Sequence, residues 1–126
     1  MECGDTGGKA ESVSRGRLHV EFRRLGGSAI LTPGGELDHS TADVLREVLD
    51  DCVDAGAVRC VIDCSKLEFC DSTGLNVLLG ARLKAEAAGG SVHLVAMRPA
   101  VSRVFEITGA GAVFTVHDTL DSALAD

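Results

Sequence analysis

Two kinds of hydrophobic spacing alternate along this chain, and each predicts a different element. In residues 17–25, RLHVEFRRL, the apolar Leu18, Val20 and Phe22 occupy every second position, which predicts a half-buried strand. Residues 28–37, SAILTPGGEL, predict a second strand. Because only Gly26-Gly27 separates the two segments, we expect them to pair as a hairpin.

The spacing then changes to that of a helix between about residues 41 and 55. Ser40 and Asp43 fit a capping box in which Asp replaces the usual Glu, and Gly56 stands where a C′ glycine is expected. Six apolar residues form one stripe of this predicted helix: Val44, Leu45, Val48, Leu49, Cys52 and Val53.

The second half of the chain repeats the alternation of strands and helices. Residues 58–64, VRCVIDC, are apolar on both faces, which indicates a central, fully covered strand. Leu75, Leu78, Leu79 and Leu83 form the stripe of a second helix that follows FCDSTG and ends at Gly89-Gly90. The remaining predicted elements are a strand at 91–97, a helix with Pro99 at N1 that Gly109 closes, a strand at 112–118 and a short helix at 119–126.

This order of elements predicts an α/β fold. We expect a mixed, mostly parallel sheet of about five strands with about four helices, in which the first strand is antiparallel at one end. Residues 1–16 are rich in Gly and Ser and show no periodicity, so we expect a flexible leader there. Residues 17–126 then form a single domain.

Composition narrows the partners and the compartment. The chain has 126 residues, 45% of them hydrophobic and 25% charged, as in a globular protein. A net charge of −7 argues against nucleic acid and anionic membranes as partners. No apolar run approaches the ~20 residues of a membrane span, and no secretory signal is visible. Five cysteines without a CxxC pair indicate reduced thiols and a cytoplasmic protein.

The candidate chemistry lies in FCDSTGLN, residues 69–76, where Asp71 or Ser72 would be the N-cap of the second helix. One interpretation is that these residues only cap the helix and have no further role. It lacks the GxSxG of a nucleophile elbow, and the chain has neither a GxxxxGK[ST] nor a GxGxxG phosphate-binding loop. Cys60, Cys64 and Cys70 lack metal-ligand spacing, so no metal or cofactor is expected.

A phospho-aspartate receiver is the rival α/β fold. It needs an acidic pair after its first strand and a late Lys that neutralises the acyl phosphate. Here the first strand ends in Arg23, Arg24 and Leu25, and no Lys follows Lys84. The sequence therefore lacks both the acid pocket and the cation of a receiver.

With these sites excluded, the remaining interpretation is a hydroxyl exposed at the N-terminus of a helix. Free backbone N–H groups and the helix dipole accept an anion there, so a phosphate on Ser72 would add about −1.5 to −2 charges without melting the helix. Asp71 would make the same point more negative, and Gly74, which lacks Cβ, would leave room for a partner. Leu75 is a candidate exposed apolar contact, although a helical Leu is more commonly in a core.

Residues 16–126 resemble a STAS domain of the anti-anti-sigma factor type. VIDCSKLEFCDSTGLNVLL at 61–79 resembles the family's buried strand, acid and D-S-[ST]-G-[LI] motif. GELDHSTA at 35–42 resembles its G-E-L-D turn before the first helix, and residues 98–124 resemble its C-terminal helix-strand-helix. Cys70 stands where the family often has a larger apolar residue, and we expect it to be a buried, inert thiol.

The resemblance implies a regulator that works by partner switching. In the family, the unphosphorylated protein binds an anti-sigma factor that is also a GHKL-type serine kinase, and so releases a sigma factor. The kinase phosphorylates the Ser after the motif Asp, and a PP2C-type phosphatase reverses this. Carried over by position, Ser72 is the phosphoacceptor and Thr73 the fallback. The implied partner-binding residues are Asp38, Asp71, Ser72, Thr73, Gly74 and Leu75.

The domain itself would not be an enzyme, since ATP belongs to the kinase. Two alternatives stay open. A STAS module without a phosphorylation cycle could be an accessory or scaffold subunit of a transport or signalling complex. A small enzyme could use Asp71 and Ser72, but the sequence positions no base or second acid beside them.

Overall fold

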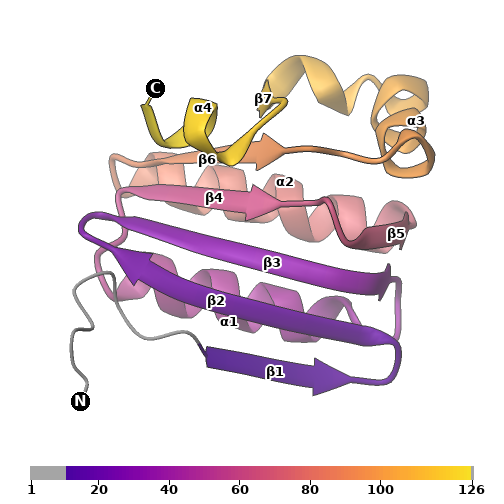
Figure 1. Ribbon diagram of the computed structural model, residues 1–126, viewed down its shortest axis with the longest axis horizontal. Coiled ribbons are helices and arrows are strands. Elements are labelled where there is room, and N and C mark those ends of the chain that lie inside the picture. Colours follow the sequence, from indigo (N-terminus) through magenta and orange to yellow (C-terminus); the bar gives the residue numbers. More distant parts are fainter. Residues whose placement is uncertain (1–10, 126) are drawn as a thin grey trace.

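The computed structural model describes residues 11–125, which fold around one mixed sheet (Figure 1). Helices α1 and α2 lie side by side on one face of the sheet, and α4 packs on the other. The strands are β1 Glu11–Arg15, β2 Leu18–Leu25, β3 Ser28–Leu37, β4 Arg59–Asp63, β5 Leu67–Cys70, β6 Ser91–Val95 and β7 Thr115–His117. The helices are α1 Ala42–Asp54, α2 Ser72–Ala87, α3 Pro99–Thr108 and α4 Leu120–Ala125, with a short 3₁₀ turn η1 at Ala110–Val113.

The strand order is β1-β2-β3-β4-β6-β7, and β5 pairs with the far end of β3. The β1–β2 and β2–β3 pairs are antiparallel, whereas the other pairs are parallel. This confirms the predicted α/β fold, its hairpin at one end and its four helices. Two strands were not predicted, β1 and β5, because each is short and carries little apolar alternation.

The strand β1 corrects the predicted N-terminal leader. Residues 11–15 pair with β2 in a hairpin closed by Gly16 and Arg17, so the expectation of a flexible leader is wrong for this part. Residues 1–10 lie outside the described residues. The antiparallel pairing of Val13 with Val20 extends the sheet by one strand.

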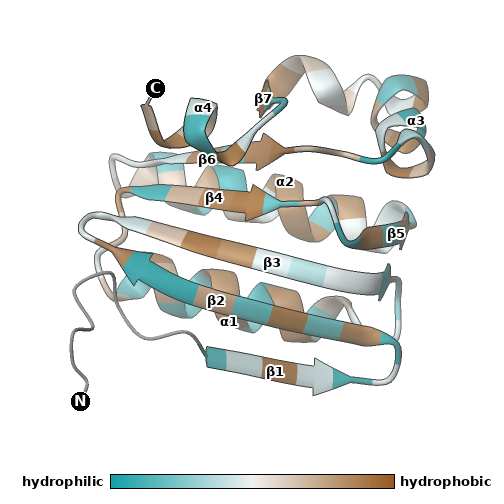
Figure 2. Cartoon of the chain, viewed as in Figure 1, coloured by the Kyte–Doolittle hydropathy of each residue, from teal (hydrophilic) through white to brown (hydrophobic). Residues whose placement is uncertain are grey.

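The core has two unequal parts. The larger part lies between the sheet and α1, α2 and α3, and the smaller one joins Ile30, Val61, Val95 and Ala123 beneath α4. Strand β4 contributes to both parts, because Cys60 and Ile62 belong to the larger one and Val61 to the smaller one. All three are 0% exposed. Figure 2 shows the hydrophobic stretch along the middle of β4. The prediction of a central strand covered on both faces is therefore confirmed.

The helix ends were predicted with mixed success. Gly56, with φ +97°, follows the C-cap of α1, and its N–H donates to Val53 O while Ala57 N–H donates to Cys52 O. These two bonds form the Schellman motif that the C′ glycine predicted. Gly109, with φ +76°, closes α3 as predicted.

Three local predictions were wrong. Ser40 is not the cap of α1, whose N-cap is Thr41. Leu83 is 63% exposed and lies outside the buried stripe of α2. The last strand is shorter than predicted, because Ala112 and Val113 belong to η1.

Within residues 11–125, no helix combines the length and the apolar character that crossing a membrane requires.

Candidate functional site

The candidate site lies where β3 and β5 end side by side. The two strands are parallel, with Leu37 paired with Cys70, so Asp38 and Asp71 leave the sheet at the same level. The N–H of Asp71 donates to Leu37 O at 3.1 Å, and the N–H of His39 donates to Asp71 Oδ2 at 3.2 Å. Hydrogen bonds thus join the loop that opens α1 to the start of α2.

Asp71 is the N-cap of α2. Its backbone is extended, with φ −100° and ψ −174°, and its Oδ1 accepts a hydrogen bond from Gly74 N–H at 3.0 Å. One carboxylate therefore caps its own helix with one oxygen and holds the neighbouring loop with the other. This is the capping geometry that an Asp at this position favours.

Ser72 is the first residue of α2 and is exposed. Because Asp71 supplies the cap, the Ser72 hydroxyl is not needed for it. Within the described part of the chain, this hydroxyl makes no hydrogen bond. It stands at the end of the helix where the dipole is positive and an anion is favoured.

Gly74 and Leu75 occupy different places from those the sequence suggested. A Cβ on Gly74 would lie 2.6 Å from Leu37 Cγ and 3.0 Å from Leu37 O, so the glycine lets α2 pack against the end of β3. Leu75 is 4% exposed and belongs to the main core. The expectations that Gly74 leaves room for a partner and that Leu75 is an exposed contact are therefore wrong.

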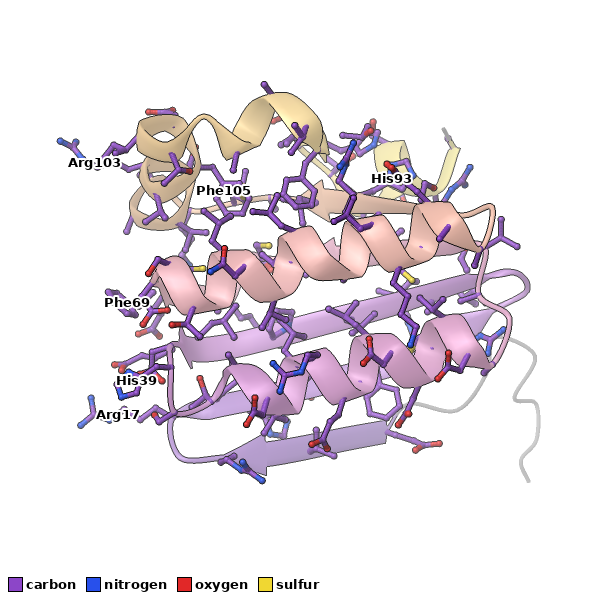
Figure 3. All side chains as sticks on the ribbon, turned by 180° about the vertical axis from the view of Figure 1, so that it is seen from behind. Arg17, His39, Phe69, His93, Arg103 and Phe105 are labelled. Atoms are coloured by element: carbon purple, nitrogen blue, oxygen red, sulfur yellow. The ribbon has the colours of Figure 1, made fainter. Side chains whose placement is uncertain are left out.

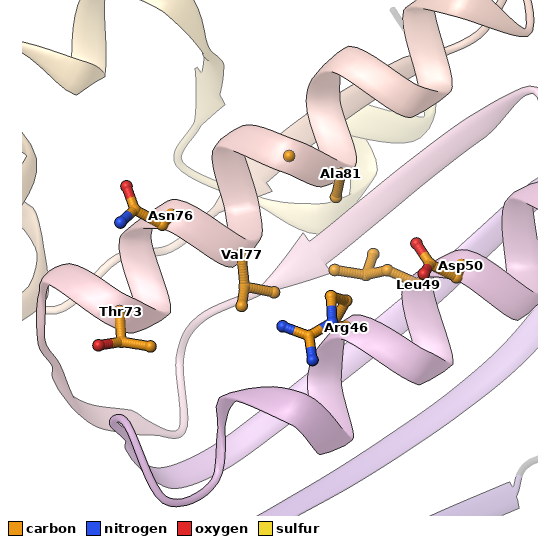
Figure 4. A pocket seen from close by; sticks show the side chains of 8 residues that line it. Arg46, Leu49, Asp50, Thr73, Asn76, Val77 and Ala81 are labelled. Carbon is orange, nitrogen blue, oxygen red and sulfur yellow. The ribbon is translucent and has the colours of Figure 1, made fainter.

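Thr73 lies at the mouth of a groove between α1 and α2, about 280 Å³ in volume (Figure 4). The groove runs along the helices from Thr73 past Asn76 to Gly80, and Arg46 forms part of its α1 side. Arg46 also forms an ion pair with Asp43 on the same helix. Thr73 is partly buried, so its hydroxyl is less available than that of Ser72.

Asp38 opens the loop before α1 and is surrounded by donors. Its Oδ1 accepts hydrogen bonds from the Ser40 hydroxyl at 2.8 Å and the Ser40 N–H at 2.9 Å. The hydrogen bond from the Ser40 hydroxyl is the main reason that the pKa of Asp38 is lowered. Asp38 and Asp71 thus flank the start of α2 with two carboxylates, close to where the sequence placed them.

Sequence reasoning missed Phe69. It lies on β5, two residues before Asp71, and is 48% exposed. Figure 3 shows Arg17, His39, Phe69 and Arg103 pointing outward at the end of the molecule where α2 begins. The sequence pattern predicts no strand at LEFC, and the exposure of Phe69 depends on the pairing of β5 with β3.

Four of the cysteines lie in the described residues, and all four are buried and free. Burial raises the pKa of Cys60 to about 11 and that of Cys64 and Cys70 to about 12. Thiols of this kind are mainly protonated at neutral pH and unreactive. Cys70, 2% exposed, therefore fits the packing interpretation. Residues 11–125 contain no group of three or more His, Cys, Asp or Glu side chains placed to hold a metal ion.

Known proteins match most of this chain. The STAS domain profile matches residues 19–123. The anti-sigma F factor antagonist of Paenibacillus polymyxa is 29% identical over 86% of this chain and 94% of its own length. The anti-sigma-B factor antagonist of Bacillus subtilis is 40% identical over 73% of this chain and 84% of its own.

Solved structures share the fold. An anti-sigma factor antagonist from Mycobacterium paratuberculosis is 27% identical, with a TM-score of 0.76 over 99% of this chain and 97% of that one. A putative anti-sigma factor antagonist from Thermotoga maritima, 24% identical, has a TM-score of 0.77 over 82% of this chain and 90% of that chain. With the family profile matched over most of its length and the D-S-T-G segment at the start of α2, this chain belongs to the STAS domain family.

Proposed function

We propose that this protein is an anti-sigma factor antagonist whose binding is controlled by phosphorylation of Ser72. With Ser72 unmodified, it binds an anti-sigma factor that carries a GHKL-type serine kinase domain, and a sigma factor is released. Phosphorylation of Ser72 ends the binding, and a PP2C-type phosphatase restores it. The chain acts as a binding regulator in the cytoplasm rather than as an enzyme.

One observation carries the proposal: the Ser72 hydroxyl is exposed at the first position of α2 and is unused by the cap. A kinase can reach this oxygen without unfolding the helix. The names of the relatives support the partner class, since the Bacillus subtilis and Paenibacillus polymyxa proteins are antagonists of anti-sigma factors. A protein of this fold, SpoIIAA, has also been solved in a phosphorylated form.

Electrostatics explains how the phosphate would act. The new charge of about −1.5 to −2 would stand beside Asp71 and near Asp38. The helix dipole tolerates the phosphate, so the fold persists. A partner surface fitted to neutral Ser72 would instead meet like-charge repulsion and the cost of desolvating the phosphate. Binding would be lost while the architecture is retained.

The binding surface combines this hydroxyl with the groups around it. Asp38 and Asp71 lie in the two loops joined by the His39 hydrogen bond, and Thr73 opens into the groove between α1 and α2. Phe69 adds an exposed aromatic ring on the adjacent strand, a residue type enriched at interfaces. Gly74 and Leu75 contribute from beneath by placing the first turn of α2 on β3.

The test uses the full chain with a purified anti-sigma factor of the same genome that carries a GHKL-type kinase domain. Ser72→Ala should bind as wild type and stay bound when ATP is added, since it cannot be phosphorylated. Ser72→Asp should bind at least about tenfold more weakly. Thr115→Asp adds the same charge on the exposed strand β7 and should leave binding unchanged.

Intact mass after incubation with ATP completes the experiment. Wild type should gain one phosphate and Ser72→Ala none; a phosphate on Ser72→Ala would transfer the role to Thr73. Equal binding by Ser72→Asp and wild type would overturn the switch. Binding without any phosphate gain would point to the accessory or scaffold alternative.

A further inference from the structure

Within residues 11–125, no strand pairs with the outer edge of β1. This strand lies at one end of the strand order (Figure 1). All five of its residues are exposed. An unpaired edge presents a row of N–H and C=O groups that can pair with another strand. We propose that β1 is a self-association surface, to which a second copy of this chain adds its own β1 in antiparallel orientation.

The hairpin geometry shows which backbone groups are available. Residues Gly16 and Arg17 form a two-residue loop, and Arg15 pairs with Leu18. Such a loop closes on a hydrogen-bonded pair, and hydrogen-bonded and non-hydrogen-bonded pairs then alternate along the ladder. Arg15, Val13 and Glu11 therefore direct their N–H and C=O groups toward β2. Ser12 and Ser14 direct theirs away from the sheet.

The sequence of β1, ESVSR, is complementary to itself when two copies run antiparallel about Val13. In this register Ser12 of one copy lies opposite Ser14 of the other, and these are the residues whose backbone groups point outward. Val13 faces Val13 at a non-hydrogen-bonded position, where side chains approach most closely. Glu11 faces Arg15 at both ends of the pairing, which is attractive.

Other alignments of the same strand are worse. In a parallel, in-register pairing, Glu11 would face Glu11 and Arg15 would face Arg15, which is repulsive. Shifting the antiparallel register by one residue would pair outward-facing backbone groups with inward-facing ones. Charges at a strand edge usually prevent association, but here they select one orientation.

The surface next to β1 has the chemistry to receive a second copy. A groove of about 260 Å³ lies between β1 and α1, and Val13, which is 39% exposed, lines it together with Phe22 and Val48. Glu47 and Asp51 of α1 also line this groove. The Val13 side chain of the second copy would meet apolar atoms, and its Arg15 guanidinium would approach carboxylates.

The association should be weak. A pair of five-residue strands buries less than the ~1,000 Å² of a stable interface, and two copies of net charge −7 repel each other. We therefore expect a dimer that forms in the high micromolar range. Because α1 lies between β1 and α2, both copies would keep Ser72 exposed.

Sedimentation of the full chain from about 10 μM to about 1 mM tests this surface. Wild type should shift from monomer to dimer. Glu11→Arg and Arg15→Glu, each alone, place like charges opposite each other and should weaken the dimer by about tenfold. The double variant and an equimolar mixture of the two single variants restore opposite charges at both ends, and should dimerise as wild type does.

A backbone variant separates strand pairing from general stickiness. Ser12→Pro removes an N–H that points outward and that β2 does not use, so the variant should fold and stay monomeric. Ser12→Thr keeps that N–H and should still dimerise. A wild type that stays monomeric at 1 mM would overturn the proposal. So would single charge variants, or a Ser12→Pro variant, that dimerise as strongly as wild type.

Discussion

The two long helices begin with nearly the same residues, but they use them differently. Asp38-His39-Ser40-Thr41 precedes α1, and Asp71-Ser72-Thr73 begins α2. Before α1, both hydroxyls are bonded within the loop: Ser40 Oγ donates to Asp38, and Thr41 Oγ1 donates to Glu36 O at 2.9 Å. At α2, Asp71 makes the cap, and the exposed Ser72 hydroxyl makes no hydrogen bond within residues 11–125.

The difference shows that residue type alone does not make a hydroxyl available. At α1 the Asp stands three residues before Thr41, and the loop folds back on itself. At α2 the Asp is the N-cap, so the following Ser is already helical, and it is exposed. Before α1 the hydroxyl of Thr41 belongs to the N-cap residue, whereas at α2 the hydroxyl of Ser72 belongs to the residue after the N-cap. This difference of one position separates a hydroxyl bonded within a turn from an exposed one.

The largest expected effect comes from moving the first turn of α2. Gly74→Ala places a methyl group 2.6 Å from Leu37 Cγ, and we expect a loss of about 2 to 3 kcal/mol in unfolding free energy. Gly80→Ala, in the same helix with no atom within 4 Å of the new Cβ, should gain up to about 1 kcal/mol. Urea unfolding compares the two variants. Equal stabilities would contradict the packing role of Gly74.

The next effect separates the two threonines. Thr41 is 3% exposed, and its hydroxyl accepts from Asp38 N–H at 2.9 Å while donating to Glu36 O. Thr41→Val leaves both groups without this partner and should cost about 1 to 2 kcal/mol. Thr73→Val makes the same chemical change at α2, where the hydroxyl has no such bonds to other described residues, and should stay within about 0.5 kcal/mol of wild type. Thermal unfolding of both variants provides the measurement.

Removing the cap of α2 should have a smaller effect. Asp71→Ala loses the hydrogen bonds from Gly74 N–H and His39 N–H, and we expect a cost of about 1 kcal/mol. Asp43→Ala, an exposed acid in the first turn of α1, serves as the control and should cost less. A cap that contributes nothing would show as equal unfolding midpoints in urea for wild type and Asp71→Ala.

The smallest effect on stability is expected at the switch itself. Ser72→Asp adds a negative charge at a helix N-terminus and removes no hydrogen bond within the described residues, so unfolding free energy should change by less than about 0.5 kcal/mol. Circular dichroism during thermal unfolding would measure this on the same sample that fails to bind the anti-sigma factor. A large stability loss would mean that the charge acts by unfolding α2.

The start of α2 could be predicted because an Asp-Ser-Thr run before an apolar stripe has few local alternatives. The fates of Gly74 and Leu75 could not, since they depend on the end of β3 lying beneath them. The capping box at Ser40 failed for a similar reason: Asp38 competes for the same hydroxyl. Local patterns determined the type of element, and long-range pairing determined which side chains are exposed.

The two missed strands illustrate the same limit. The strand β5, LEFC, has only four residues, and the alternation of Leu67, Glu68 and Phe69 is too short to predict a strand. It forms because β3 extends past its pairing with β4, so the backbone groups of Gly35 to Leu37 can pair with another strand. Phe69 is exposed as a result, and this exposure follows from the strand pairing and not from the composition.

The thin covering of one sheet face has a consequence for native-state fluctuations. The helix α4 spans only Leu120–Ala125, buries Ala123 and is linked to β4 by the Arg59 bond to Leu124 O at 2.9 Å. In hydrogen–deuterium exchange, its amides should exchange through local opening long before those in the middle of α2, which unfold only with the whole domain. Such openings would transiently wet Val61 from one side while the scaffold that carries the α2 terminus stays intact.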